Sequence, residues 1–332
     1  MEFSYSVVIR TLGNTGEKYQ RLLQSIEKQS VKPEEIIVAI PEGYDLDFCL
    51  GYERIVRCKK GMTAQRAAGI NVAKSDYILV VDDDVAFDES MVEELYDYLN
   101  QNGLDCCLPM SGESCSETDK KINLFYPLKT RLRNGFTGQM LTSRRKSDYL
   151  DVLTYTAGHK VYVNSNDLDK CYLCTTACFQ CFFIKTSLAQ MAHFEEEIWL
   201  DEGTLSHYAA FDEPVFFRKL SLIGFRMAYS LRTRYQHLDG SVGHVSRTKL
   251  EAKSIRYYSI ARNRTIYWYK FIWMPSGSVV DKAKALFGGV YGVVNYTILT
   301  VLLNLNPYSV KSLKALFKGY KDASCYIRNL KK

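Results

Sequence analysis

Two clusters of acidic residues are the groups in this chain most able to carry chemistry. Asp82, Asp83 and Asp84 are adjacent and directly follow an apolar run. Alternate residues of an extended chain project the same way, so Asp82 and Asp84 can share one hard divalent cation and leave coordination positions for phosphates and water. A solvated acidic turn is the alternative explanation. Asp212 and Glu213 form the second cluster, which is also compatible with a helix N-terminus whose acids offset the helix dipole.

The first 105 residues supply the strands and helices that would position the acidic triplet. The expected strands are 5–9, 35–40, 55–57 and 77–81, and the expected helices are 17–28 and 63–73. Strands that are apolar on both faces and separated by helices indicate a parallel sheet covered on both sides. Such sheets bind ligands beyond the carboxyl ends of their strands. Functional residues are therefore expected just after Ile9, Ile40 and Val81. Periodic patterns return later, at 175–184 and 213–224.

The composition is that of a folded protein, since 47% of the 332 residues are hydrophobic and 24% are charged. The segment from Lys311 to Lys332 holds seven basic residues and one acid, which equals the whole net charge of +6. A second stretch, Lys120 to Ser147, holds eight Lys or Arg and no acid. Such clusters favour phosphates or anionic lipid head groups as partners. No nucleic-acid recognition motif accompanies them, so nucleic acid is not expected as a partner.

The ten cysteines do not indicate a disulfide framework in a chain of this length. The first residues, MEFSYSVVIR, lack the basic and apolar regions of a signal peptide, so a reducing cytoplasm with free thiols is expected. Four cysteines follow the pattern C-x2-C-x3-C-x2-C, namely Cys171, Cys174, Cys178 and Cys181. This spacing allows a zinc or iron–sulfur site. Because the segment runs into an apolar strand over 179–184, we favour small buried side chains over metal ligands.

The segment from Tyr5 to Val85 resembles the family 2 glycosyltransferases. The matching features, in chain order, are SVVI at 6–9, Thr11, LLQSI at 22–26, Gln29, PEEIIV at 33–38, Gly61, Arg66, GI at 69–70, Ala73, DYIL at 76–79 and DDDV at 82–85. The resemblance implies the GT-A fold, an α/β class with a Rossmann-like, mixed but mainly parallel sheet flanked by helices. It implies a nucleotide-sugar-binding half at 1–105 and an acceptor-binding half at 106–275. Residues 276–332 are expected to form a helical, basic and apolar extension.

The same resemblance implies roles for the residues around the acidic triplet. Asp82 and Asp84 form a DxD motif, at which Mg²⁺ or Mn²⁺ bridges the protein to the diphosphate of a sugar donor, and Asp83 contacts the donor ribose or sugar. Thr11 and Glu42 border the nucleoside pocket, and Arg66 approaches the nucleotide from the helix that follows Gly61. Family members often have Asp where this chain has Pro41-Glu42, and Asn where it has Ala67. The base and the sugar of the donor therefore stay open.

The second acidic cluster resembles the acidic pair of inverting family members. Inversion needs a base that removes the proton of the acceptor hydroxyl during in-line attack. Glu213 aligns with that base, and Asp212 is the reserve candidate. A lone histidine is more often a hydrogen-bonded structural residue. His237, however, resembles a histidine that reaches the metal or diphosphate in related enzymes, so it is a third candidate metal ligand beside Asp82 and Asp84.

The C-terminal part of the chain has an apolar segment before its basic tail. Leu286 to Leu305 is a mostly apolar stretch of 20 residues, long enough to cross a hydrocarbon layer. A buried helical hairpin, a membrane-spanning helix and a helix lying on the membrane surface are the alternatives. The three glycines and four Asn or Thr residues in the stretch weaken a span, so we favour a helix on an anionic, cytoplasmic membrane surface.

The expected function is metal-dependent, inverting transfer of a sugar from a nucleotide-diphosphate donor, a UDP-sugar being favoured. The expected acceptor is a saccharide or a lipid-linked saccharide used in cell-surface polysaccharide synthesis at the inner face of the membrane. One alternative is a nucleotidyltransferase of similar fold, but Thr11-Leu12-Gly13-Asn14 lacks the Gly-rich, basic loop of such enzymes. A catalytically decayed carbohydrate- or membrane-binding relative is the other alternative.

Overall fold

The computed structural model describes most of the chain. The described residues are 3–14, 16–112, 149–161, 168–177, 180–202, 210–238, 249–302 and 309–330. The basic stretch from Lys120 to Ser147 and the third cysteine of the four-cysteine pattern, Cys178, lie outside them.

The first third of the chain forms the elements that the sequence predicts, with ends that differ by one residue at most. They are β1 (Tyr5–Arg10), α1 (Glu17–Glu27), β2 (Glu35–Pro41), β3 (Arg54–Cys58), α2 (Met62–Val72) and β4 (Tyr77–Asp82). Three further elements follow that the sequence reasoning did not predict: β5 (Val85–Phe87), α3 (Met91–Gln101) and β6 (Cys106–Ser111). The acidic triplet thus begins on the last residue of β4.

The rest of the chain adds strands and then helices. The strands are β7 (Tyr149–Leu153), β8 (His159–Val161), β9 (Tyr172–Cys174), β10 (Cys181–Lys185) and β11 (Met227–His237). The helices are α5 (Thr186–Met191), the 3₁₀ helix η2 (Phe194–Leu200), α6 (Asp212–Ile223), α7 (Lys249–Trp268), the π-helical turn η4 (Tyr269–Trp273), α8 (Val279–Leu302) and α9 (Ser309–Leu330). The periodic segment at 213–224 corresponds to α6, and most of the expected strand at 179–184 lies in β10.

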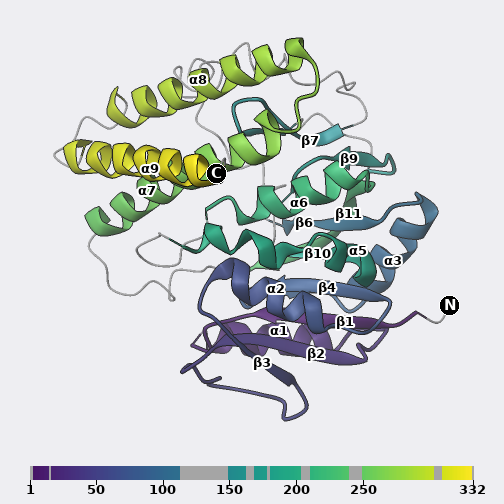
Figure 1. Cartoon of the computed structure of the whole chain (residues 1–332). Coiled ribbons are helices and arrows are strands. Elements are labelled where there is room, and N and C mark those ends of the chain that lie inside the picture. Colours follow the sequence, from purple (N-terminus) through teal and green to yellow (C-terminus); the bar gives the residue numbers. More distant parts are fainter. Residues whose placement is uncertain are drawn as a thin grey trace, which may run out of the picture.

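The described strands form one mixed sheet (Figure 1) in the order β3-β2-β1-β4-β10-β6-β11-β9-β7-β8, with β5 beside β11. The four strands β3, β2, β1 and β4 are all parallel, whereas β10 is antiparallel to both β4 and β6. Parallel pairing recurs between β6 and β11. This arrangement confirms the expected mixed α/β fold. The parallel pairs in the N-terminal part bring the carboxyl ends of β2, β1 and β4 to a common edge.

Apolar layers cover both faces of the sheet. Val7 and Ile9 of β1 pack on one face with residues of α1 and α3. Val8, between them in the sequence, packs on the other face with residues of α2 and α6. All three side chains are essentially inaccessible to solvent. This two-sided burial explains the uninterrupted apolar runs of the central strands.

The cysteines of the four-cysteine pattern that the structure describes lie on or beside strands. Cys174 and Cys181 are buried, and Cys171 is half-buried. Burial raises the pKa of the Cys181 thiol well above its usual value. Within the described ranges, no three or more His, Cys, Asp or Glu residues are grouped so that they could hold a metal ion. Cys174 and Cys181 thus act as small core residues.

The C-terminal helices α7, α8 and α9 lie at the opposite end of the molecule from β3 (Figure 1). Glycines on α8 allow close packing, because a Cβ at Gly289 would lie 2.5 Å from the ring of Trp268 on α7. Large apolar side chains of α8 close to Gly289 in the sequence are exposed, among them Leu286, Phe287 and Val290. None of the helices, as far as the chain is described, combines the length and apolar character that a membrane crossing requires.

Candidate active site

The candidate donor residues lie at the shared carboxyl edge of β2, β1 and β4, as the parallel sheet requires. Thr11 directly follows β1, Glu42 directly follows β2, and the aspartates begin at the last residue of β4. The side chain of Glu42 is exposed, whereas Thr11 is buried. The sheet therefore brings together three segments, the outermost of which, at Thr11 and Asp83, are 72 residues apart in the sequence.

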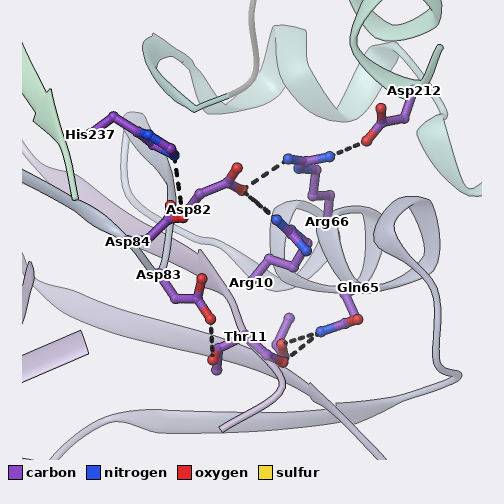
Figure 2. Close-up of polar contacts among 10 residues, drawn as sticks. Arg10, Thr11, Gln65, Arg66, Asp82, Asp83, Asp84, Asp212 and His237 are labelled. Carbon is purple, nitrogen blue, oxygen red and sulfur yellow. Dashed lines mark hydrogen bonds and ion pairs between the residues drawn. The ribbon is translucent and has the colours of Figure 1, made fainter. Parts of the chain in front are cut away.

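Asp82 is held by two arginines rather than facing solvent alone (Figure 2). Its Oδ1 accepts hydrogen bonds from Arg10 Nη2 at 3.0 Å, from Arg10 Nε at 3.2 Å and from Arg66 Nη2 at 2.9 Å. Burial alone would raise the pKa of Asp82, but these two guanidinium groups hold it below its usual value. The positive charge that the aspartate cluster requires is thus supplied in part by the protein itself.

Arg66 also reaches the second acidic cluster. Its Nη1 donates to Oδ2 of Asp212, the first residue of α6, so that Arg66 bridges the end of β4 and the start of α6 (Figure 2). The side chain of Arg66 is only 1% exposed. Burial raises the pKa of Asp212, although Arg66 acts in the opposite direction. Arg10, Asp82, Arg66 and Asp212 form a row of alternating charges, which we call the ion-pair row.

Glu213 follows Asp212 in the first turn of α6 and is half-buried. The ion-pair row engages the Asp212 carboxylate, so the two neighbouring acids have different surroundings. The helix begins after Phe211, whose φ of 78° is left-handed and turns the chain sharply into α6. Such a conformation is unfavourable for a residue with a side chain.

The middle aspartate, Asp83, contacts the loop after β1. Its Oδ2 accepts a hydrogen bond from Thr11 Oγ1 at 2.5 Å, and Thr11 Oγ1 accepts one from the backbone N–H of Gly13 at 2.9 Å. Burial raises the pKa of Asp83 to about 6. Gly13 is required here, since its φ is +83° and a Cβ would meet the backbone oxygen of Asp45 at 2.0 Å.

The last aspartate, Asp84, faces His237 at the end of β11. Asp84 Oδ2 and His237 Nε2 are 3.3 Å apart, and both side chains are partly exposed. The backbone N–H of Leu238 also donates to the carbonyl of Asp84 at 2.7 Å. Burial, followed by the charge of Asp82, raises the pKa of Asp84. The structure thus brings together two of the predicted metal ligands from segments 153 residues apart.

No group of three candidate ligands occurs among the described residues, so a divalent cation here would bind few protein groups and take its other positions from substrate and water. Asp84 and His237 offer one carboxylate and one imidazole, and Oδ2 of Asp82 accepts no hydrogen bond within the described part of the chain. Hard cations that act on phosphates often take one or two carboxylates from the protein and fill their other positions with phosphate oxygens and water. The donor set is therefore compatible with Mg²⁺ or Mn²⁺.

Helix α2 is fixed by polar contacts at its N-terminal end. Gln65 Nε2 donates to the carbonyls of Thr11 and Ala39 at 2.7 and 3.1 Å. Asp201 accepts from the backbone N–H groups of Thr63 and Ala64 at 3.2 and 2.9 Å, which satisfies donors that a helix N-terminus leaves without intrahelical partners. These contacts set the position from which Arg66 enters the ion-pair row.

The sequence reasoning missed three residues around the site: Arg10, Gln65 and Asp201. For Arg10 a signal was available. It is a charged residue at the carboxyl end of an apolar strand, and a parallel register that aligns Ile9 with Val81 places it beside Asp82. Asp201 accepts a hydrogen bond from Ala64 on α2, which is 137 residues away in the sequence. No local sequence pattern predicts that contact.

Comparison with known proteins agrees with this geometry. Residues 6–147 match the model of "Glycosyl transferase family 2". This match confirms the resemblance drawn from the sequence and supports a transferase.

A similar curated protein is poly(ribitol-phosphate) beta-N-acetylglucosaminyltransferase TarP of Staphylococcus aureus (strain N315). It is 27% identical over 119 residues, which cover 32% of this chain. The match spans 36% of the length of TarP.

Solved structures that align with this chain include GalNAc-T7 with UDP, GalNAc and Mn²⁺, at a TM-score of 0.46 and 12% identity, covering 86% of this chain and 55% of that one. Residues 1–349 of S. aureus TarS align with a TM-score of 0.44 and 12% identity, covering 97% of this chain and 91% of that one.

Proposed function

We propose that this family-2 enzyme transfers a sugar, with inversion, from a nucleotide-diphosphate donor to a hydroxyl of a saccharide acceptor. The observation that carries the proposal is the ion-pair row. It joins the aspartates at the end of β4, which suit a diphosphate and its metal, to the acidic pair that begins α6. Groups suited to leaving-group stabilisation and to proton removal are thereby held in one site.

The donor would lie at the carboxyl edge of β2, β1 and β4. Thr11 and Glu42 border the place of the nucleoside, and Asp83 is positioned by Thr11 to accept hydrogen bonds from a ribose or sugar. A UDP-sugar is the favoured donor. We propose that residues 1–105 form this donor half, that 106–275 form the acceptor half, and that 276–332 are an extension.

Asp84 and His237, with the second oxygen of Asp82, would hold Mn²⁺ or Mg²⁺. When bound, such an ion neutralises charge that develops on the departing diphosphate. The protein's own contribution at this point is to keep Asp82 ionised through its two arginines, and to hold Asp84 and His237 face to face.

Glu213 would act as the base. It removes the proton from the acceptor hydroxyl while the acceptor oxygen bonds to the anomeric carbon and the bond from that carbon to the diphosphate oxygen breaks. Asp212 is less suited, because its carboxylate is buried against Arg66. Asp212 is instead placed to hold the first turn of α6, and with it Glu213, close to the donor edge.

The acceptor is proposed to be a saccharide or lipid-linked saccharide of a cell-surface polymer. The similar protein TarP is named for transfer to a poly(ribitol-phosphate). We further propose that the protein works at the cytoplasmic face of the membrane. The exposed apolar side chains of α8 and the exposed lysines of α9, among them Lys311, Lys314 and Lys318, support this location.

Titration calorimetry with UDP and GDP, with and without Mn²⁺, tests the proposed function. We expect one of the two nucleotides to bind, and to bind more tightly when Mn²⁺ is present. A hydrolysis screen with nucleotide sugars of that base would then identify the sugar. Absence of metal-dependent binding by both nucleotides would contradict the proposal and favour the decayed binding protein. Release of pyrophosphate from a nucleoside triphosphate and a sugar phosphate would favour the nucleotidyltransferase.

A further inference from the structure

Arg10 and Arg66 both contact Asp82, but they differ in what else they can reach. Arg66 is 1% exposed and lies between two carboxylates, those of Asp82 and Asp212. Arg10 is 19% exposed. It is the last residue of β1 and pairs in register with Asp82, so its side chain lies at the carboxyl edge where the donor is proposed to bind.

The hydrogen bonds of Arg10 leave the Nη1 nitrogen of its guanidinium available to a ligand. Nε and Nη2 both donate to the same oxygen, Oδ1 of Asp82. Nη1 has no hydrogen-bond partner among the described residues, and it is not sealed from solvent. Figure 2 shows the guanidinium of Arg10 between Asp82 and the loop at Thr11. A planar guanidinium that is fixed along one edge can still donate from its other nitrogen to a second anion.

The charges around Arg10 favour such an anion only if it carries its own cation. Asp82, Asp83 and Asp212 are close enough to raise the pKa of Arg10 against the effect of burial, so the region is acidic overall. A diphosphate that arrives with a divalent ion at Asp84 and His237 would bring that compensation with it.

We propose that Arg10, rather than Arg66, is the arginine that contacts the diphosphate of the donor, and that Arg66 is a positioning residue that acts through Asp82 and Asp212. The assignment rests on the proposed function, since it presumes a nucleoside diphosphate at this edge. It differs from the expectation drawn from family resemblance, which gave the nucleotide contact to Arg66. Arg10 would hold a phosphate oxygen and offset charge that builds on the leaving group.

The test compares nucleotides that differ by one phosphate. Titration calorimetry with UDP and UMP, and with GDP and GMP, is carried out in Mn²⁺ on the full-length chain and on Arg10→Gln. The wild type should prefer the diphosphate. In Arg10→Gln the affinity for the diphosphate should fall at least about tenfold, the usual effect of losing a hydrogen bond to a charged group. The affinity for the monophosphate should change little, so that the preference collapses.

Arg54→Gln is the matched control, because Arg54 is a partly exposed, ion-paired arginine at the opposite, amino end of β3. It should retain the diphosphate preference of the wild type. If Arg10→Gln does not fold, Arg10→Lys replaces it in the test. A lysine bound to Asp82 lacks the second guanidinium nitrogen, so it should also lower the preference for the diphosphate over the monophosphate. If a folded Arg10 variant keeps the wild-type preference for the diphosphate, the assignment of Arg10 to the diphosphate is wrong, but the proposed function still stands. A wild-type chain that binds none of the four nucleotides would contradict the proposed function itself.

Discussion

Asp212 and Glu213 are adjacent, yet their surroundings suit them to different tasks. The carboxylate of Asp212 is buried and paired with Arg66, whereas Glu213 is half-buried in the next position of α6. A general base must reach the acceptor hydroxyl and accept its proton. The Asp212 carboxylate is held by Arg66 beside the end of β4, which suits it to positioning rather than to contact with an acceptor. The difference between the two residues is therefore measurable.

Replacing Glu213 by Gln should leave donor binding close to that of the wild type but lower the rate of transfer by at least about a hundredfold, the usual contribution of a general base. Nucleotide titrations and single-turnover transfer assays measure the two quantities separately. Asp212→Asn should lower the stability of the protein as well as its rate. An active Glu213→Gln variant together with an inactive but stable Asp212→Asn variant would move the base by one residue.

Asp84 should be required for metal-assisted binding. We expect Asp84→Ala to remove the effect of Mn²⁺ on nucleotide affinity and to abolish turnover, because it deletes the carboxylate that faces His237. Calorimetry in the presence and absence of Mn²⁺ is the measurement. His237→Ala should weaken the same effect. Retention of the full Mn²⁺ effect in both variants would exclude this pair as the metal site.

Arg66 should contribute strongly to stability. Arg66→Ala would leave the buried carboxylates of Asp82 and Asp212 without their shared partner, and breaking a buried ion pair from one side costs about 3–5 kcal/mol. Urea denaturation should show a loss of that order. Arg57→Ala is a suitable control, since Arg57 is exposed and its ion pair with Asp45 lies at the surface. Similar losses for the two variants would mean that the ion-pair row is not a structural element.

At the scale of elements, the N-terminal strands and helices could be predicted from the sequence and much of the site could not. Uninterrupted apolar runs such as 77–81 and the amphipathic spacing of α1 are local signals. The rule that ligands bind at carboxyl ends then indicated the positions after Ile9, Ile40 and Val81, and the family resemblance assigned roles to Thr11, Glu42 and the aspartates there. The contact of Arg66 with Asp212 joins α2 to α6 over 146 residues, and side-chain pairing at that distance leaves no periodicity in the sequence. The strand β11, which carries His237, mixes polar and apolar residues and was missed.

The cap on α2 should make stability depend on pH. Burial raises the pKa of Asp201 in the folded protein to about 6, above the ordinary value of an aspartate, about 3.9. The folded state therefore takes up this proton before the unfolded state does, so the contribution of Asp201 to stability should rise as pH falls from about 6 to about 4.

Asp201→Asn keeps an oxygen that can accept hydrogen bonds from α2 and removes the titration. The free energy of unfolding of the wild type, relative to that of Asp201→Asn, should be larger at pH 5 than at pH 7 in urea denaturation experiments. A difference that is the same at both pH values would show that the Asp201 carboxyl titrates normally in the folded state.

At the scale of the whole molecule, the apolar side of α8 gives a test of the proposed membrane location. Leu286 and Phe287 are 52% and 55% exposed, so replacing both by Gln should affect folding little. We expect this double variant to float less with vesicles that contain phosphatidylglycerol. Leu222 and Ile223 at the end of α6 are similarly exposed, and their double replacement by Gln is the matched control. Equal flotation of the two variants would argue against α8 as the contact surface.

The place of β10 in the sheet has a consequence for how the chain can be cut and how it emerges during translation. β10 is inserted between β4 and β6, so β4 gains its second neighbour only after Lys185 has been made. A fragment that stops near residue 105 would expose the backbone of an apolar strand, which invites aggregation. We expect such a fragment to be insoluble, and residues 1–105 to complete their folding on the ribosome only once the chain beyond Lys185 has been made.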